Sequence, residues 1–151
     1  MACEDILKVE HPLGRMLSIL GKGYLHLLRV RLSHLDIDRN YFALVVIDAC
    51  DGDITQQELS LMLDTDKVSI VRVIDYLSVK GYVKRKRNKN DKRKYSLSLT
   101  EKAKLALPEI KESFSEINKI VLKGLQDQQI SELSESIRKI KHNITENIHI
   151  L

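Results

Sequence analysis

A helical pattern that passes directly into an extended one constrains the fold of this chain most, between Asp66 and Thr100. Its first half places apolar side chains at the spacing of one helix face, at Ile70, Val73, Ile74 and Leu77. Gly81 follows, and glycine readily adopts the left-handed conformation that ends helices. From Lys94 to Thr100 apolar and polar residues alternate, which predicts a strand with one face buried and with Ser96 and Ser98 on the other face. We therefore predict a packed helix followed by a β-hairpin.

The hairpin carries the densest positive charge of the chain. Its first strand is expected to begin at Tyr82, and its turn falls at residues 88–91. Nine Lys or Arg and one acid lie between Lys80 and Lys94, a net charge of +8; since the whole chain carries +4, the remaining residues sum to −4. Such clustering indicates a polyanionic partner, because neighbouring cations release counterions from a phosphate backbone. A solvated basic segment is the alternative, but the packed helix and strand predicted on either side favour a binding element.

Two short helices before the hairpin are predicted to form a helix-turn-helix. Thr55 and Glu58 have the spacing of a capping box, so a helix begins there, and it ends near Asp64. Thr65 or Asp66 can cap the next helix after a turn of about three residues. With its apolar face turned inward, this second helix has on or beside its opposite face Lys67, Val68, Val71, Arg72, Asp75 and Tyr76. Ser69, in its first turn, is also among the predicted DNA contacts.

These side chains suit contacts with a DNA major groove, which the second helix of such a motif enters with its N-terminal half. Arg72 can bind a guanine bidentately. Val68 and Val71 can touch thymine methyl groups, and core packing is their alternative role. Lys67 and Tyr76 suit phosphates, although an ordinary surface position is the alternative for Tyr76. Helix, turn, second helix and basic hairpin together predict a winged helix-turn-helix.

The fold class is predicted to be mostly α with a small β-hairpin. Only six Gly and two Pro occur in 151 residues, which favours long regular elements. A long helix is expected over His11–Leu35, and its apolar surface is wider than one stripe. A second helix is expected over Tyr41–Cys50, with Asp38 as a plausible N-cap, followed by a turn at Asp51–Asp53.

The C-terminal third is also predicted to be helical. One helix begins at Thr100 and ends at Gly124, and Pro108 should kink or divide it. The last helix begins at Asp127, and its apolar stripe continues to Leu151.

These terminal helices carry more apolar surface than one short chain can cover, which predicts a homodimer. We assign residues 37–100 to a winged helix-turn-helix DNA-binding domain, and residues 1–36 with 101–151 to a helical dimerisation region. A two-fold dimer suits DNA half-sites about one helical turn apart. A monomeric helical bundle is the alternative.

The segment from Leu59 to Ala103 resembles the winged helix-turn-helix of the MarR family of bacterial and archaeal transcriptional regulators. The resemblance rests on Lys80-Gly81, on Tyr82-Val83 with Arg85, on Asp91-Lys92-Arg93 and on Leu97-Ser98-Leu99-Thr100. Ala103 departs from the pattern, since many members have Gly there. The resemblance implies a homodimer that binds a double-stranded DNA operator with its recognition helices in successive major grooves.

The resemblance also implies roles in the wing. Arg93 matches the wing arginine that enters the neighbouring minor groove, where a narrow groove concentrates negative potential. Asp91 matches the acid that braces wing arginines by ion pairing, and Arg85 matches a basic residue at the base of the wing. Lys89 and Lys92 complete the predicted set of DNA contacts.

Members of the family usually bind small aromatic effectors in a cleft between the dimer helices and the winged domain. The corresponding candidates are Met16, Tyr24, Arg29, Tyr41 and Phe42, and core packing or surface exposure is the alternative for each. Some similar regulators respond to oxidation of a thiol near the N-terminus. Cys3 lies there but is more simply a spectator, and Cys50 is more simply a core residue.

Other functions find little support in the sequence. The chain has neither an HExxH motif nor a glycine-rich phosphate loop nor a nucleophile elbow, so we predict no enzyme, no cofactor and no metal site. His26 and His34 lie two helical turns apart and could not share a metal ion unaided. Without a long apolar run or a signal peptide, a cytoplasmic protein is expected. The competing interpretation is a helical interaction module whose basic hairpin binds acidic protein or RNA without sequence selection.

Overall fold

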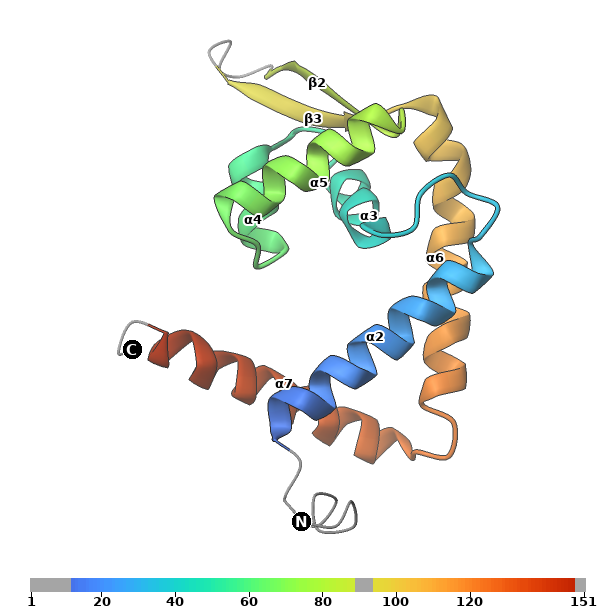
Figure 1. Cartoon of the computed structure of the whole chain (residues 1–151), viewed down its shortest axis with the longest axis vertical. Helices are drawn as coiled ribbons and strands as arrows, with labels where there is room; N and C mark the ends of the chain where they lie inside the picture. Colours follow the sequence, from blue (N-terminus) through green and yellow to red (C-terminus); the bar gives the residue numbers. More distant parts are fainter. Residues whose placement is uncertain (1–11, 89–93, 149–151) are drawn as a thin grey trace, which may run out of the picture. The chain divides into compact units, whose positions relative to one another are not determined.

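The computed structural model describes residues 12–88 and 94–148 (Figure 1). In chain order its elements are α2 (Leu13–Arg31), α3 (Tyr41–Ala49), β1 (Ile54–Thr55), α4 (Gln56–Met62), α5 (Lys67–Val79), β2 (Val83–Arg87), β3 (Tyr95–Leu99), α6 (Glu101–Val121) and α7 (Asp127–Asn147). This content confirms the predicted fold class, mostly α with a small β-sheet. Backbone contacts divide the chain into two compact units, Met1–Ile117 and Asn118–Leu151, so the boundary falls near the end of α6.

Helix α5 has the two ends expected from its sequence. Asp66 is the N-cap, and its Oδ1 accepts hydrogen bonds from two backbone N–H groups of the first turn, each at 2.9 Å. Gly81 lies beyond the other end with φ +75°. Its N–H and that of the next residue donate to carbonyls of the last helical turn, at 2.9 Å each. This arrangement is a Schellman motif, and it ends α5 directly before β2.

Helix α4 begins with the predicted capping box. Thr55 Oγ1 accepts a hydrogen bond from the N–H of Glu58 at 3.2 Å, and Glu58 Oε2 accepts one from the N–H of Thr55 at 2.8 Å. The helix ends at Met62, and Asp64 adopts a left-handed conformation with φ +47°. Helices α4 and α5 with the connection between them form the predicted helix-turn-helix.

The sheet contains a strand that the sequence did not reveal. The short strand β1 pairs antiparallel with β3 on the side opposite β2, so β3 is the central strand. The prediction that Ser96 and Ser98 occupy an exposed face is wrong, because both are buried. The turn before β1 covers that face so closely that a Cβ on Gly52 would lie 3.2 Å from the Cβ of Ser98.

The segment between α2 and α3 also differs from the prediction. Helix α2 ends at Arg31 rather than at Leu35. Asp38 does not cap α3; the N-cap is Asn40, with φ +64° and no side-chain cap hydrogen bond. The Asp38 carboxylate instead accepts a hydrogen bond from the hydroxyl of Tyr76 in α5 at 2.7 Å. A partner distant in sequence thus replaces the local cap.

The core of the first unit joins α3, α5, the sheet and the first part of α6. Its fully buried side chains include Leu44, Ile47, Ile70, Ile74, Leu77, Leu97 and Ile110. Three of them belong to the predicted inward face of α5, and its fourth residue, Val73, is partly buried. Burial of this apolar face stabilises the fold and fixes the rotation of α5 about its own axis. The opposite face of α5 consequently points to solvent.

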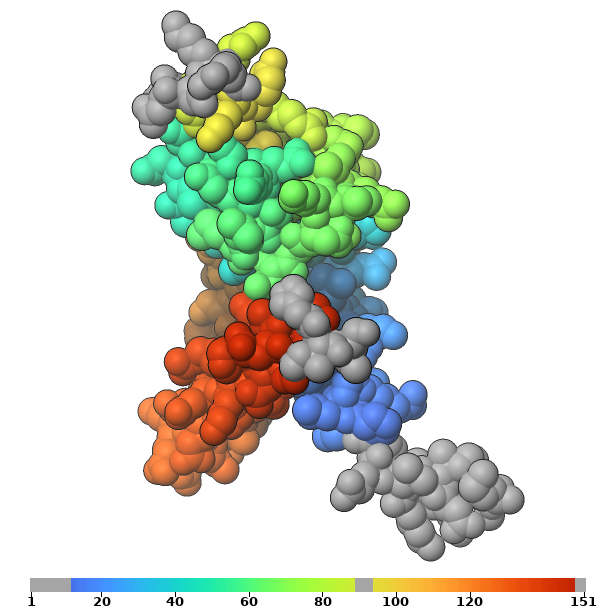
Figure 2. All heavy atoms as spheres, turned by 90° about the vertical axis from the view of Figure 1, so that its left-hand side faces the viewer, coloured from blue at the N-terminus to red at the C-terminus, as the bar shows by residue number. Residues whose placement is uncertain are grey.

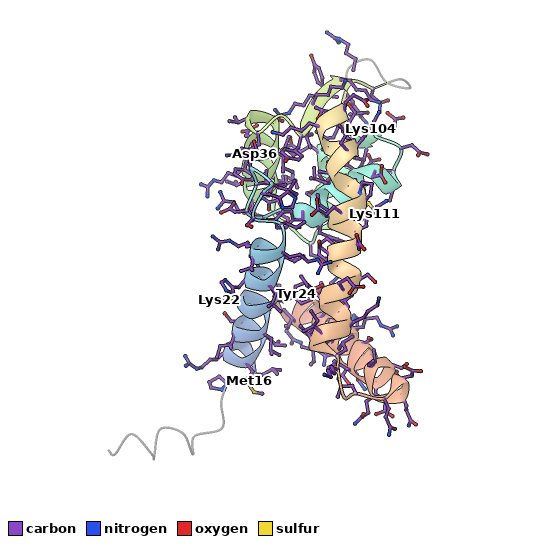
Figure 3. The ribbon with its side chains drawn as sticks, turned by 90° about the vertical axis from the view of Figure 1, so that its right-hand side faces the viewer. Met16, Lys22, Tyr24, Asp36, Lys104 and Lys111 are labelled. Atoms are coloured by element: carbon purple, nitrogen blue, oxygen red, sulfur yellow. The ribbon has the colours of Figure 1, made fainter. Side chains whose placement is uncertain are left out.

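Pro108 was predicted to kink or divide the helix that begins after Thr100. Helix α6 is not divided there, since it runs without interruption from Glu101 to Val121. Thr100 begins it as predicted, since Thr100 Oγ1 accepts a hydrogen bond from the N–H of Ala103 at 3.3 Å. Arg31 at the end of α2 donates from Nε to Ser113 Oγ of α6 at 3.2 Å. Figure 3 shows Met16, Lys22 and Tyr24 along α2, and Lys104 and Lys111 along α6.

Helix α7 of the second unit begins at Asp127, as predicted. Gln126 is its N-cap and donates its backbone N–H to Gln129 Oε1 at 2.8 Å within a capping box. None of the α7 residues is buried. Its apolar stripe is 43–63% exposed at Leu133, Ile137, Ile144 and Ile148.

Within the described ranges, every helix is too short or too polar to span a membrane.

Candidate nucleic-acid interface

The outward face of α5 brings together most of the side chains that the sequence predicted for base and phosphate contacts. Lys67 and Arg72 are exposed, and among the described residues neither has a hydrogen-bond or ion-pair partner. Val68 is 63% exposed and Val71 37% exposed, so core packing does not explain these two valines. Figure 2 shows the atoms of α4 and α5, in green, at the molecular surface next to strands of the wing, in yellow.

Ser69 is engaged at the N-terminus of the same helix. Its hydroxyl donates to Asp66 Oδ2 at 2.6 Å, while its backbone N–H donates to Asp66 Oδ1. These hydrogen bonds from Ser69 hold the pKa of the Asp66 carboxyl below its ordinary value. The hydroxyl hydrogen of Ser69 is already engaged in the hydrogen bond to Asp66. In a contact with DNA, Ser69 would therefore accept a hydrogen bond through its hydroxyl oxygen.

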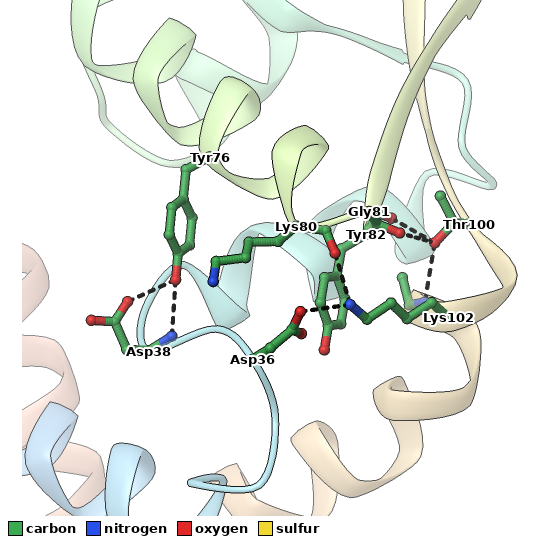
Figure 4. Close-up of polar contacts among 9 residues, drawn as sticks. Asp36, Asp38, Tyr76, Lys80, Gly81, Tyr82, Thr100 and Lys102 are labelled. Carbon is green, nitrogen blue, oxygen red and sulfur yellow. Dashed lines mark hydrogen bonds and ion pairs between the residues drawn. The ribbon is translucent and has the colours of Figure 1, made fainter.

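Tyr76 is directed to the connection between α2 and α3 (Figure 4). Its hydroxyl donates to Asp38 Oδ1 at 2.7 Å and accepts from the Asp38 N–H at 3.1 Å. The Arg39 guanidinium carbon lies 4.7 Å from the centroid of the Tyr76 ring. Burial and the Asp38 carboxylate raise the pKa of Tyr76, and the hydroxyl in turn lowers the pKa of Asp38. In this structure Tyr76 therefore joins α5 to the rest of the domain.

Arg85 joins the wing to α5. Its Nη2 lies 2.7 Å from Oδ1 of Asp75, which is on the exposed side of α5. The side chain of Arg85 is 39% exposed and that of Asp75 is 54% exposed. The sequence predicted Arg85 as a basic residue at the wing base but did not predict this partner.

A second contact of the wing, near the tip end of its strands, involves a buried serine. Asn88 Nδ2 donates to Ser96 Oγ at 2.6 Å, and Ser96 Oγ donates to Asp53 Oδ1 at 2.9 Å. The three side chains link the turn after α3 to both strands of the hairpin. Sequence analysis missed this link because it placed Ser96 in solvent.

The tip of the wing lies outside the described residues, and with it Lys89, Asp91, Lys92 and Arg93. Their predicted DNA contacts remain predictions. At the described edge, the guanidinium carbon of Arg87 lies 5.6 Å from the ring centroid of Tyr95, across the hairpin.

Known proteins with similar sequence and structure include regulators that were solved in complex with DNA. A family model described as the MarR family matches residues 38–94, which run from the start of the α3 region into the wing. A putative MarR family transcriptional regulator from Listeria monocytogenes, complexed with 26mer DNA, is 26% identical; the match covers 91% of this chain and 92% of that chain, with a TM-score of 0.79. A mutant MarR from E. coli, complexed with operator DNA, is 28% identical over 85% of this chain and 93% of that chain, with a TM-score of 0.74.

The chain belongs to the MarR family. A MarR transcriptional regulator from Methanosarcina mazei Go1 is also similar, at 28% identity and a TM-score of 0.74 over 90% of this chain and 98% of that chain. The likeness therefore extends beyond the winged domain to the flanking helices. As a MarR-family protein the chain is a transcriptional regulator, and the family assignment confirms the prediction that it is not an enzyme.

The residues suggested as MarR-type effector contacts do not gather at one site. Tyr41 is a core residue, only 2% exposed, and its hydroxyl donates to the Ile37 carbonyl at 3.0 Å. Phe42 is 55% exposed, and its ring meets that of Phe114 edge-on at a centroid distance of 6.1 Å. Met16 is exposed, and Tyr24 is half-buried against the core.

Arg29 alone of these residues lines a cleft between the end of α2, the following connection and the C-terminal half of α5. The cleft has a volume of about 630 Å³, and its polar lining includes His26, Arg29, Asp36, Asp38, Arg39, Tyr76 and Lys80. Asp38 lies 3.9 Å from Arg29 and 4.0 Å from Arg39, measured between their closest charged atoms.

The remaining sequence candidates carry no assembled site. Cys50 is half-buried against the core, and Cys3 lies outside the described residues. His34 Nε2 lies 2.9 Å from Glu109 Oε2, an ion pair when the imidazole is protonated. Within residues 12–88 and 94–148, no three His, Cys, Asp or Glu side chains are grouped closely enough to hold a metal ion.

Proposed function

We propose that this MarR-family regulator binds a specific double-stranded DNA operator as a homodimer, with the N-terminal half of α5 in a major groove of each half-site. The observation that carries the proposal is the state of the outward face of α5. On the inward face of α5, Ile70, Ile74 and Leu77 are buried. On the outward face, Lys67, Val68, Val71 and Arg72 are exposed, and the two cations are free of partners among the described residues. Exposed valines flanked by free cations suit a groove that offers both methyl groups and phosphates.

We assign the base and phosphate contacts from this face. Arg72 binds a guanine edge, Val68 and Val71 contact thymine methyl groups, and Lys67 binds a phosphate. In the wing, Arg93 enters the adjacent minor groove, with Asp91 as its brace and Lys89 and Lys92 near the backbone. Arg85 acts mainly through Asp75, because its Nη2 already pairs with the Asp75 carboxylate.

Two exposed apolar surfaces support the homodimer. On α2, Leu20 is 67% exposed and Val30 is 61% exposed. On α7, no residue is fully buried, and Leu133, Ile137 and Ile144 are 43–54% exposed. Contiguous apolar surface of this kind marks an interaction site, and a second copy of the same chain provides a matching one. We therefore keep residues 1–36 and 101–151 as the dimerisation region.

We further propose that the cleft beside Tyr76 binds a small aromatic anion. Arg29, Arg39 and Lys80 supply positive charge there, and Asp38 now balances the two arginines. A carboxylate ligand would compete with Asp38 for these arginines and so disturb the hydrogen bond from Tyr76 to Asp38. Effector binding would then shift the population between DNA-compatible and incompatible positions of α5. A regulator of this kind acts on chromosomal DNA, so we propose a cytoplasmic location.

Selection of bound sequences from a random DNA pool tests the main proposal. The selected duplex and a scrambled duplex of the same length and composition are then compared by mobility shift at physiological salt. We expect the selected sequence to bind at least about 10³-fold more tightly. Equal affinities would instead support the competing interpretation, a module whose basic hairpin binds polyanions without sequence selection.

A further inference from the structure

The C-terminal end of the recognition helix is held by a side chain from α6, away from the face proposed to bind DNA. Lys102 Nζ donates to the carbonyl oxygen of Lys80 at 2.8 Å and to Asp36 Oδ2 at 2.8 Å (Figure 4). The same nitrogen lies 4.5 Å from the ring centroid of the buried Tyr82. One ammonium group thus contacts α5, the start of the wing and the connection between α2 and α3.

The Lys80 carbonyl is a group that needs a partner. Lys80 is the C-cap of α5, and the last carbonyls of a helix have no intrahelical donor. They also carry the negative end of the helix dipole, which a cation stabilises. The next carbonyl, that of Gly81, accepts a hydrogen bond from Thr100 Oγ1 at 2.6 Å. Two residues at the start of α6 therefore secure the end of α5.

The connection between α2 and α3 holds α5 at a second point. Asp36 contacts Lys102, and Asp38 contacts Tyr76, one turn earlier on α5 than Lys80. Two attachments at different heights along a helix restrict both its tilt and its rotation. Since this connection continues directly from α2, a movement of the end of α2 reaches α5 through these two carboxylates.

We infer that Lys102 and Asp36 form a positioning pair for the recognition helix, which couples the end of α2 to the orientation of α5. The inference rests on the proposed function, because positioning matters when α5 reads a groove. The alternative is an ordinary surface ion pair, since the side chains of Lys102 and Asp36 are 46% and 50% exposed. Such a pair would contribute little to stability, and it would have no effect on sequence discrimination.

The decisive variant is Lys102→Met, which keeps an unbranched apolar chain over Tyr82 and removes the donors. Its matched control is Lys104→Met, which removes the same charge from the same helix, where Lys104 pairs only with neighbouring Glu101 at 2.8 Å among the described residues. We expect Lys102→Met to lose about tenfold in affinity for the selected operator relative to the control. Affinity for scrambled DNA should be equal in the two variants, because their charges are equal.

Three further measurements complete the test. Lys102→Arg should recover most of the operator affinity, since it restores a cation with several donors. Asp36→Ala should also weaken operator binding, and the double variant with Lys102→Met should lose less than the sum of the two single losses. Amide hydrogen exchange, which needs no DNA, should be faster at residues 79–82 in Lys102→Met than in Lys104→Met, with both proteins folded at the measuring temperature.

The outcomes separate this inference from the proposed function. If wild-type protein does not distinguish operator from scrambled DNA, the proposed function fails, and hydrogen exchange still decides whether Lys102 restrains α5. Equal operator affinity of Lys102→Met and Lys104→Met overturns the inference while leaving the proposed function intact. Unchanged exchange at residues 79–82, or an equal loss for operator and scrambled DNA, overturns it as well.

Discussion

Arg85 Nη2 lies 2.7 Å from Asp75 Oδ1, so an ion pair fastens the first strand of the wing to the exposed side of the recognition helix. The two elements that approach DNA in the proposed complex are thereby linked to each other. The pair is half exposed, and exposed pairs contribute at most about 1 kcal/mol to folding stability. Its main effect should be on the geometry of the interface.

Asp75→Asn separates this geometric effect from simple electrostatics. If charge alone mattered, removal of a carboxylate near the DNA would tighten binding. We expect the opposite, an operator affinity about three- to tenfold weaker, because the wing base is released from α5. Mobility-shift titration with the selected operator measures the change. Tighter binding by Asp75→Asn would refute the linking role of the ion pair.

Arg72 and Lys67 should respond differently to truncation. Arg72→Ala should cost about 1–3 kcal/mol of operator binding and relax the base preference at one position, because a bidentate contact to a base edge is lost. Lys67→Ala should weaken binding to all sequences alike and reduce the salt slope by about one. Selection from a random pool and a salt titration of each variant measure these effects. A preserved base preference in Arg72→Ala would remove Arg72 from sequence readout.

Arg93→Ala tests the wing tip. We expect weaker operator binding and a salt slope reduced by about one, because one cation leaves the neighbourhood of the phosphates. A narrow, A·T-rich minor groove attracts arginine. Replacing the A·T pairs of the operator where the wing binds by G·C pairs should therefore weaken the binding of wild-type protein more than the binding of Arg93→Ala. Fluorescence anisotropy at several salt concentrations provides the measurement. An unchanged affinity would exclude Arg93 from the interface.

The capping box of α4 predicts a pH effect on stability. Hydrogen bonds from the backbone and hydroxyl of Thr55 lower the pKa of Glu58 below its ordinary value of 4.5. A carboxyl whose pKa is lower in the folded state stabilises the fold above its unfolded pKa, and this contribution is lost as pH falls through the folded pKa. Glu58→Gln should therefore reduce stability at pH 7 by about 1 kcal/mol or less. The difference from wild type should shrink as pH falls below 4.5 and through the lowered folded-state pKa of Glu58.

Urea unfolding of both proteins at several pH values checks this expectation. The matched control is Glu101→Gln, because the pKa of Glu101 is lowered mainly by Lys104 and not by a capping box. A stability difference for Glu58→Gln that is constant from pH 7 to pH 3 would mean that the carboxylate charge does not stabilise the cap.

Gly52→Ala tests the close packing behind the wing. The added methyl group would lie 3.2 Å from the Cβ and 3.3 Å from the Cα of Ser98, at a position with φ +64°. We expect a loss of about 1–3 kcal/mol in folding stability, from backbone strain together with steric contact. Gly124→Ala is the control, because its φ is +91° but nothing lies within 4 Å of its added Cβ. A smaller loss in Gly52→Ala than in the control would show that Ser98 moves aside easily.

Several features followed from the sequence because the interactions that produce them are local. The capping box joins Thr55 to Glu58, three residues apart, and Gly81 ends α5 through hydrogen bonds within a single turn. The inward face of α5 followed from its periodicity, since one apolar stripe must be buried. From that burial the exposure of Lys67 and Arg72 followed as well.

Other features were decided only by tertiary structure, because their partners lie far apart in the chain. Ser96 alternates with apolar neighbours and was predicted to be exposed, but the turn before the distant strand β1 covers its face, where its hydroxyl donates to Asp53. Asp38 stood at a position suited to capping the next helix, yet its carboxylate accepts a hydrogen bond from Tyr76. Arg85 likewise forms an ion pair with Asp75, and Lys102 donates a hydrogen bond to the carbonyl of Lys80. The local sequence around a side chain determines which contacts are available to that side chain. Which of these contacts forms depends on the segments, distant in sequence, that pack against it.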